Sequence, residues 1–230
     1  MILEHLKAIV ILKDLDDRSM RSIEHFFTTK VFKAGACILN YDSETDSVMA
    51  LCSGLIRVSL ITPQAKEMVI RDIKPGELVG DWAAIDDKPR SAQVVAIQDS
   101  VIALIKKADF LALVTHHPHI ALRQMQELTK QLRAMSWRLT EFVAMKADLR
   151  VQSVILDFAI QTPEGLFIPK MAGHQEIAAR AFTQREVVAR EITALQKEGV
   201  LVRHNEGFLI PNPERLELLQ ERKNYKHQST

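Results

Sequence analysis

Three charged side chains near the end of the chain have the types and the spacing of a helix that reads DNA bases. Arg185 and Glu186 are adjacent, and Arg190 follows within about one and a half helical turns. An arginine offers two parallel donors to guanine O6 and N7, and a glutamate accepts from cytosine N4. If Val188 and Ile192 turn inward, the charged residues project outward together. This arrangement favours a helix that lies in a major groove.

A plain solvated helix face is the competing interpretation of the same residues. Basic and acidic side chains balance each other within residues 174–206. Arginines and glutamates on one helix can also simply pair with each other. Charge alone therefore does not separate a DNA-reading helix from a solvated one.

A second constellation of polar residues lies within residues 75–92, where a Gly-Glu-Leu-Val-Gly-Asp turn precedes Pro-Arg-Ser-Ala. Backbone N–H groups, the Ser91 hydroxyl and the Arg90 guanidinium could hold a phosphodiester, and a carboxylate could accept from a ribose hydroxyl. The alternative is a surface turn in which Arg90 pairs with Asp86 or Asp87. The motif therefore indicates an anion site without excluding the simpler turn.

The elements that must position these residues change character twice along the chain. Residues 1–30 have the apolar spacing of short helices, and residues 31–105 consist of short β-branched runs separated by glycine and proline turns. This pattern predicts an antiparallel barrel or roll. Residues 118–146 then show a helical period. After them a helix, a short strand, two further helices and a hairpin at residues 200–210 predict a winged helix-turn-helix.

The sequence thus predicts an α+β chain with an N-terminal antiparallel β-roll flanked by helices, a long dimerisation helix and a C-terminal winged helix-turn-helix. The predicted domains are residues 1–117, 118–146 and 147–230.

Apolar residues form a narrow stripe along the helix predicted for residues 118–146. Spacings of four and three suit a helix that pairs with a second copy of itself. Packing of the stripe on the chain's own barrel is the alternative. The stripe consists of Leu128, Leu132, Met135, Leu139 and Phe142, and Leu122 and Met125 extend it toward the N-terminus.

Composition excludes several classes of protein. The 230 residues are 47% hydrophobic and 26% charged, as in chains that form a real core. A net charge of +1 means that any DNA binding must come from local arrangement. Cys37 and Cys52 are too few for a disulfide framework or an iron–sulfur cluster, and we expect both in the core. Without a signal peptide or a membrane span, a cytoplasmic location is expected. No nucleophile stands in a motif with its base, so we expect no enzyme activity.

The chain resembles the catabolite activator family. The resemblance rests on four features in this order: the barrel, the polar cassette at residues 75–92, the stripe helix and the Gln-Arg-Glu-Val-Val-Ala-Arg segment. This CRP/FNR superfamily comprises cyclic-AMP receptor proteins and fumarate-nitrate-reduction-type regulators, and the resemblance covers nearly the whole chain. It implies a homodimeric bacterial transcription factor with a cyclic-nucleotide-binding-like roll. The implied partners are double-stranded DNA with a palindromic site and RNA polymerase.

Matched positions imply roles for individual residues. The resemblance implies that Arg185, Glu186 and Arg190 contact bases. It also implies that Gln175 and Gln184 lie near phosphates. The effector site would comprise Gly80, Asp81, Arg90 and Ser91, with Ser136 reaching adenine from the partner's long helix.

Departures from the family pattern bear on the effector. Asp81 stands in place of the usual glutamate and is one methylene shorter, and Met135 replaces the threonine that reads adenine. Both disfavour the usual cyclic-AMP response. Haem remains open, although residues 57–107 contain no histidine, and we expect neither an iron–sulfur cluster nor another metal site. The effector is therefore unknown, with a cyclic nucleotide and haem as the candidates.

The turn between the two DNA helices also departs from the family. Phe182 occupies a position where glycine is usual, so we expect that turn to be altered or strained. The second hypothesis for the chain is a ligand-sensing module whose C-terminal unit binds protein rather than DNA.

Overall fold

The computed structural model describes residues 2–44, 46–62, 66–205 and 207–214. The chain divides into two compact units, Met1–Ala134 and Met135–Thr230. Each unit has its own hydrophobic core. Within the described ranges, no helix is both long and apolar enough to cross a membrane.

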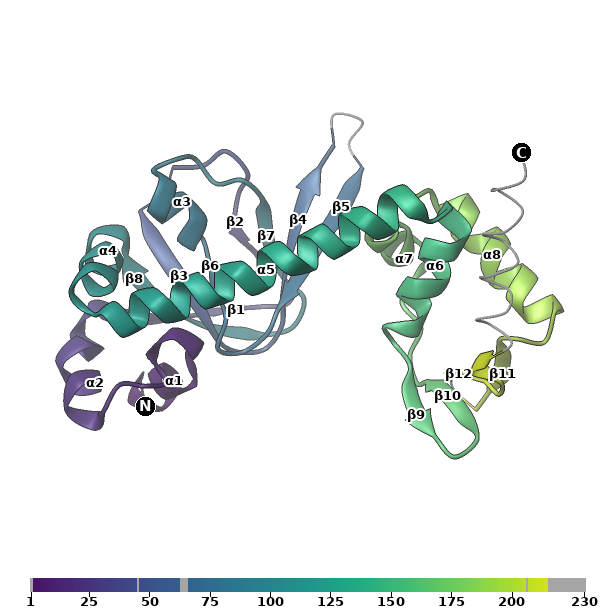
Figure 1. The fold of residues 1–230 in the computed structure, drawn as a ribbon, viewed down its shortest axis with the longest axis horizontal. Coiled ribbons are helices and arrows are strands. Elements are labelled where there is room, and N and C mark those ends of the chain that lie inside the picture. The colour runs from purple at the N-terminus through teal and green to yellow at the C-terminus, as the bar shows by residue number, and fades with distance from the viewer. Residues whose placement is uncertain (1, 45, 63–65, 206, 215–230) are drawn as a thin grey trace. The chain divides into compact units, whose positions relative to one another are not determined.

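The first unit is built on two antiparallel four-stranded sheets (Figure 1). One sheet has the order β1-β8-β3-β6 and the other the order β2-β7-β4-β5. The strands are β1 (Phe27–Phe32), β2 (Cys37–Leu39), β3 (Ser47–Ser53), β4 (Ile56–Ile61), β5 (Glu67–Ile73), β6 (Leu78–Val79), β7 (Gln93–Ala96) and β8 (Ser100–Lys106).

Strand β3 separates two hydrophobic clusters. Because side chains alternate along a strand, Val48 and Ala50 enter the cluster formed with the flanking helices. Met49 and Leu51 point the opposite way, into the cluster between the two sheets. Burial on both faces explains why this strand appears in the sequence as a continuous apolar run.

Helices flank the sheets of the first unit and connect them. Cys52 is buried as expected, whereas Cys37 is exposed, so its expected place in the core is wrong. Cys37 begins β2, a strand whose side chains are exposed or only partly buried. The helices are α1 (Ile2–Ala8), α2 (Asp17–Ile23), α3 (Asp81–Asp86), α4 (Lys107–His116) and α5 (Pro118–Ala144), with short 3-10 turns at Val10–Leu12 and Glu24–Phe26.

The second unit packs three helices on a small antiparallel sheet of order β11-β12-β10-β9. The expected hairpin is present, with Val202 paired to Leu209, and Asn205 adopts a positive φ of 50° at its turn. The elements are α6 (Ala147–Leu156), β9 (Ile160–Thr162), β10 (Gly165–Ile168), α7 (His174–Arg180), α8 (Arg185–Lys197), β11 (Val202–His204) and β12 (Gly207–Ile210).

The predicted fold class is confirmed: an antiparallel β-domain is followed by a long helix and a helix-turn-helix domain. The long helix ends at Ala144, two residues before the predicted end. The compact units divide between Ala134 and Met135, inside α5. The domain boundaries given by the sequence follow the element ends instead, and they stay a prediction.

Candidate nucleic-acid interface and effector site

Helices α7 and α8 pack through small and branched side chains. Ile177 and Ala178 of α7 and Val188 and Ile192 of α8 are all buried. The small Ala178 side chain leaves room for α8 to approach closely. This packing turns the opposite face of α8 outward.

The outer face of α8 carries the predicted base-reading residues. Arg185, Glu186 and Arg190 are all exposed. Among the described residues, none of the three has a hydrogen-bond or ion-pair partner. Within the described part of the chain these side chains therefore do not form intrahelical pairs with one another, and all three are exposed to solvent. Gln175, in the first turn of α7, and Gln184, just before α8, are also exposed.

Glu191 is a residue of α8 whose role the sequence analysis missed. It is only 6% exposed, and one of its carboxylate oxygens accepts from the Gln152 amide of α6, which is fully buried. Its position three residues after Val188 and four before Leu195 places it on the buried helix face, which is the signal that could have revealed it. The contact fixes how α8 sits on α6.

Of the two outcomes expected for the turn between α7 and α8, an altered or a strained backbone, the structure shows the strained one. Phe182 adopts a φ of +49°, in the left-handed region that favours glycine. The turn is closed by the Thr183 backbone N–H, which donates to the Ala178 carbonyl over 3.0 Å. A phenylalanine thus holds the conformation for which the family uses glycine.

In the first unit, the Arg90 guanidinium turns inward to the backbone. Arg90 is 3% exposed and donates from Nη1 to the Gly80 carbonyl at 2.8 Å and from Nη2 to the Ser47 carbonyl at 2.5 Å. Gly80 has a φ of +82°, and a Cβ there would lie 2.1 Å from Arg90 Nη1. Burial lowers the pKa of Arg90, opposed by the charges of Asp46 and Asp81. Arg90 Nε has no partner among the described residues.

The surface-turn alternative for the cassette is wrong. Asp86 pairs with Lys88, and Asp87 pairs with Lys107, so neither carboxylate is the partner of Arg90. Arg90 instead lies inside the roll, where backbone carbonyls that no side-chain pattern reveals are its acceptors.

Asp81 is held by a residue of the long helix. Asp81 is 3% exposed, and its Oδ2 accepts from Gln124 Nε2 over 2.6 Å. Burial raises the pKa of the Asp81 carboxyl, although the Gln124 hydrogen bond lowers it. Gln124 is also 3% exposed, and its Oε1 has no partner among the described residues. Sequence analysis missed Gln124; its place four residues after the buried Ile120 was the available signal.

Replacement of Asp81 by asparagine should stabilise the protein. An asparagine amide can donate to the unpaired Gln124 Oε1 and removes a buried charge, so we expect a gain of about 1 kcal/mol. The pKa of Asp81 is higher in the folded protein than in the unfolded chain. The free energy of unfolding of the wild type therefore falls as pH rises from about 4, the unfolded value, through the folded value. Over this range the stability difference between Asp81→Asn and the wild type increases.

Thermal melts of Asp81→Asn at several pH values measure this effect. Asp86→Asn, on the exposed side of the same helix, is the matched control and should shift stability by less than about 0.5 kcal/mol. A less stable Asp81→Asn, or a difference from wild type that does not change with pH, would contradict the assignment.

The structure brings together Gly80, Asp81 and Arg90, but not all of the predicted effector residues. Ser91 is exposed beside Arg90. Ser136 is an exposed residue of the second compact unit. Met135, which stands in place of the family's adenine-reading threonine, is 41% exposed in the same unit.

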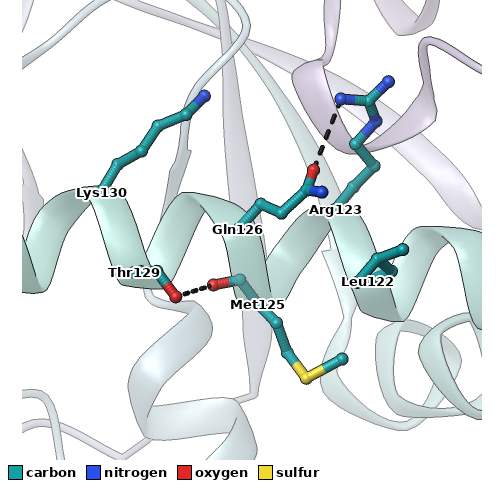
Figure 2. Close-up of a pocket in the computed structure, with 6 residues that line it drawn as sticks. All are labelled: Leu122, Arg123, Met125, Gln126, Thr129 and Lys130. Atoms are coloured by element: carbon teal, nitrogen blue, oxygen red, sulfur yellow. Dashed lines mark hydrogen bonds between the residues drawn. The ribbon is translucent and has the colours of Figure 1, made fainter.

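One face of α5 is apolar and uncovered. Leu122, Met125, Leu132 and Leu139 are between 53% and 65% exposed. Figure 2 shows the residues that line a pocket on this helix, and every one of them comes from α5 itself. Leu128 is half-buried. The lining residues are Leu122, Arg123, Met125, Gln126, Thr129 and Lys130.

Two family models match the chain in the order of its two units. The model described as cyclic nucleotide-binding domain matches residues 29–117, and the Crp-like helix-turn-helix domain matches residues 149–219. The chain belongs to the CRP/FNR family of transcription regulators. CRP/FNR proteins are regulators and not enzymes, so this chain is a DNA-binding transcription regulator under effector control.

Known proteins of the CRP/FNR family resemble the chain over most of its length. It is 29% identical over 176 residues to the Cyclic AMP receptor protein of Thermus thermophilus, covering 76% of this chain and 80% of that protein. It is 19% identical over 195 residues to the Anaerobic regulatory protein of Bacillus subtilis, covering 82% and 81%.

Solved structures of CRP/FNR regulators share the fold. The c-di-GMP responsive regulator CLP of Xanthomonas campestris has a TM-score of 0.75 at 16% identity, covering 86% of this chain and 100% of that one. A CooA mutant of Carboxydothermus hydrogenoformans has a TM-score of 0.74 at 20% identity, covering 93% and 95%.

Proposed function

We propose that this regulator reads a palindromic DNA site as a homodimer, with Arg185, Glu186 and Arg190 on base edges. The observation that carries the proposal is that these three side chains are exposed and unpaired among the described residues. Two-fold symmetry would place the half-site centres about 34–36 Å apart. Gln175 and Gln184 would contact phosphates, which position a protein on DNA without reading its sequence.

The uncovered face of α5 supports the dimer. Regulators of this family bind DNA as homodimers. Met125, Leu132 and Leu139 recur every seven residues, and Leu122 lies three residues before Met125, which places the four along one heptad seam. Leu128, Met135 and Phe142 follow three residues after Met125, Leu132 and Leu139 as the alternate positions of the same seam, and Leu128 is half-buried.

The effector would bind at the cassette formed by Gly80, Asp81, Arg90 and Ser91. Both charged groups are already used inside the roll, Arg90 by backbone carbonyls and Asp81 by Gln124. A cyclic nucleotide must replace these charge-assisted hydrogen bonds, each worth about 1.5–3 kcal/mol, before it gains its own. This competition disfavours cyclic AMP, and Ser136 would join the site only as a residue of the second subunit.

The identity of the effector can be read from what co-purifies. Mass spectrometry of small molecules released from the folded protein separates a cyclic nucleotide from haem. A bound cyclic nucleotide would contradict the argument that the contacts of Arg90 and Asp81 disfavour cyclic AMP. No histidine that could ligate haem lies between residues 57 and 107. The described residues also contain no cluster of three metal-ligating side chains.

Duplex binding at a series of salt concentrations tests the proposed function. We expect random duplex to bind weakly at low salt, with log affinity falling against log salt at a slope of about −0.9 per phosphate contacted. Selection from a random library should then return a palindrome. A protein-binding unit would show no such slope, and absence of duplex binding would reject the proposal.

We also propose that this regulator acts in the cytoplasm of a bacterial cell and delivers its effect through RNA polymerase. Its similarity to bacterial regulators supports this proposal.

A further inference from the structure

The turn between α7 and α8 carries a residue that its backbone does not favour. Phe182 holds a φ of +49°, a conformation that glycine adopts without a steric cost. A bulky side chain persists in such a position when surrounding contacts hold it there. The contacts of the Phe182 ring are therefore informative.

The Phe182 ring packs on the last turns of α5. It meets the Phe142 ring edge to face, with centroids 6.0 Å apart and planes at 75°. The Arg138 guanidinium lies over the Phe182 ring, 4.9 Å from its centroid. Phe142, predicted from sequence as a dimer-interface residue, thus contacts the helix-turn-helix turn of its own unit. Edge-to-face aromatic pairs and cation–π contacts are both directional, so they fix orientation as well as distance.

Two arginines bind the carbonyl groups of the same turn. Arg138 donates to the Arg180 carbonyl at 3.2 Å. Arg150 of α6 donates to the carbonyls of Ala181 at 2.9 Å and Phe182 at 3.3 Å. The carbonyls lie at the last residue of α7 and just after it, where cations and hydrogen-bond donors are favourable.

Arg150 also spans the break between α5 and α6. A third nitrogen, Nη1, donates to the Met145 carbonyl at 2.8 Å, just past the end of α5, and the guanidinium lies 4.7 Å from the centroid of the Phe142 ring. One side chain thus ties together the end of α5, the start of α6 and the turn before α8.

These four residues, Arg138, Phe142, Arg150 and Phe182, form what we call the arginine–phenylalanine clamp. All four lie in the second compact unit, which begins at Met135 within α5. The last turns of α5 therefore belong with the DNA-binding helices. The non-helical residues Met145 and Lys146, which would be the natural hinge, are bridged by the clamp.

We propose that Arg150 and Phe182 are positioning residues for DNA reading, because they hold the start of α8 rigidly on the end of α5. The orientation of α5 then sets the orientation of the recognition helix. In a dimer paired along α5, the clamp fixes the distance between the two recognition helices and makes the protein strict about half-site spacing. This last step rests on the proposed function.

Two variants remove the clamp without removing the turn. Phe182→Gly deletes the ring and supplies the residue that suits a positive φ, so the turn keeps its conformation. Arg150→Lys keeps the charge but loses the planar donor geometry that reaches several carbonyls. Arg133→Lys, an exposed arginine earlier on α5, is the matched control.

Hydrogen exchange on the full-length chain tests the physical link. We expect both clamp variants to raise the exchange of amides in residues 139–144 by about tenfold or more, as local protection is lost. Arg133→Lys should leave these amides unchanged. Unchanged exchange at residues 139–144 in Phe182→Gly would overturn the proposal.

Operator spacing tests the consequence for DNA reading. On the selected palindrome with one base pair inserted between the half-sites, wild type should lose affinity by about tenfold or more, and Phe182→Gly should lose clearly less. If Phe182 had a merely structural role, Phe182→Gly would bind both operators more weakly by the same factor. Phe182→Gly would then lose as much affinity from the inserted base pair as the wild type does, and this result would overturn the proposal. If wild type selects no palindrome, the proposed function fails, and hydrogen exchange alone still decides whether the clamp exists.

Discussion

Arg185→Ala should weaken binding to the selected operator by about 1–3 kcal/mol and relax the preference at one G·C pair in each half-site. Arg185 is exposed in the first turn of α8 and has no ion-pair partner among the described residues. Its removal therefore costs no intramolecular contact, and the change in affinity reports the contact with DNA. Binding to the operator and to each single-base variant of the pair that Arg185 is expected to contact, at one salt concentration, measures both effects.

Lys197→Ala is the matched control for this substitution. It removes the same charge from the last turn of the same helix, away from the predicted base contacts. We expect it to lower affinity slightly and equally for all sequences, because only the long-range field changes. An equal loss for all sequences in Arg185→Ala itself would make Arg185 a phosphate contact, and the base-reading assignment would be wrong.

Leu132→Glu should convert the dimer into monomers. Leu132 is 65% exposed in the single chain and lies in the middle of the apolar face of α5. In a paired helix the two glutamates would be buried beside each other, and desolvation of unpaired carboxylates costs several kcal/mol. Sedimentation velocity measures the change directly, and operator affinity should fall with the loss of the second half-site contact.

Ala134→Glu tests whether the face, and not the added charge, is responsible. Ala134 is exposed two residues further on, so its side chain points to the opposite side of the helix. This variant should sediment as a dimer. If Leu132→Glu also sediments as a dimer, the interface between subunits lies elsewhere.

The residues that face outward were the most predictable part of this protein. Val188 and Ile192 had to turn inward, so the positions of Arg185, Glu186 and Arg190 followed from the helical period. The short apolar run of β3 predicted a buried strand in a related way, because both of its faces are covered. Periodicity identifies the buried side of an element and therefore its exposed side as well.

Contacts between polar groups distant in sequence were not predictable. The Asp81–Gln124 hydrogen bond joins residues 43 positions apart, and its formation depends on how α5 lies along the roll. Arg90 was expected to bind an anion or a carboxylate, but its partners are backbone carbonyls, which every residue carries. For Phe182, the sequence predicted an unusual turn but gave no indication that α5 would supply its neighbours.

The buried Gln152–Glu191 contact bears on how this regulator can evolve. The remaining inward residues of α8, such as Val188 and Leu195, are apolar and would tolerate a small rotation of the helix about its own axis. The hydrogen bond to Glu191 specifies one rotation. Because the pose of α8 is set from the inside, positions 185, 186 and 190 can accept new side chains while their geometry stays constant. The operator preference of a descendant could therefore change one base pair at a time, without a compensating change in the rest of the fold.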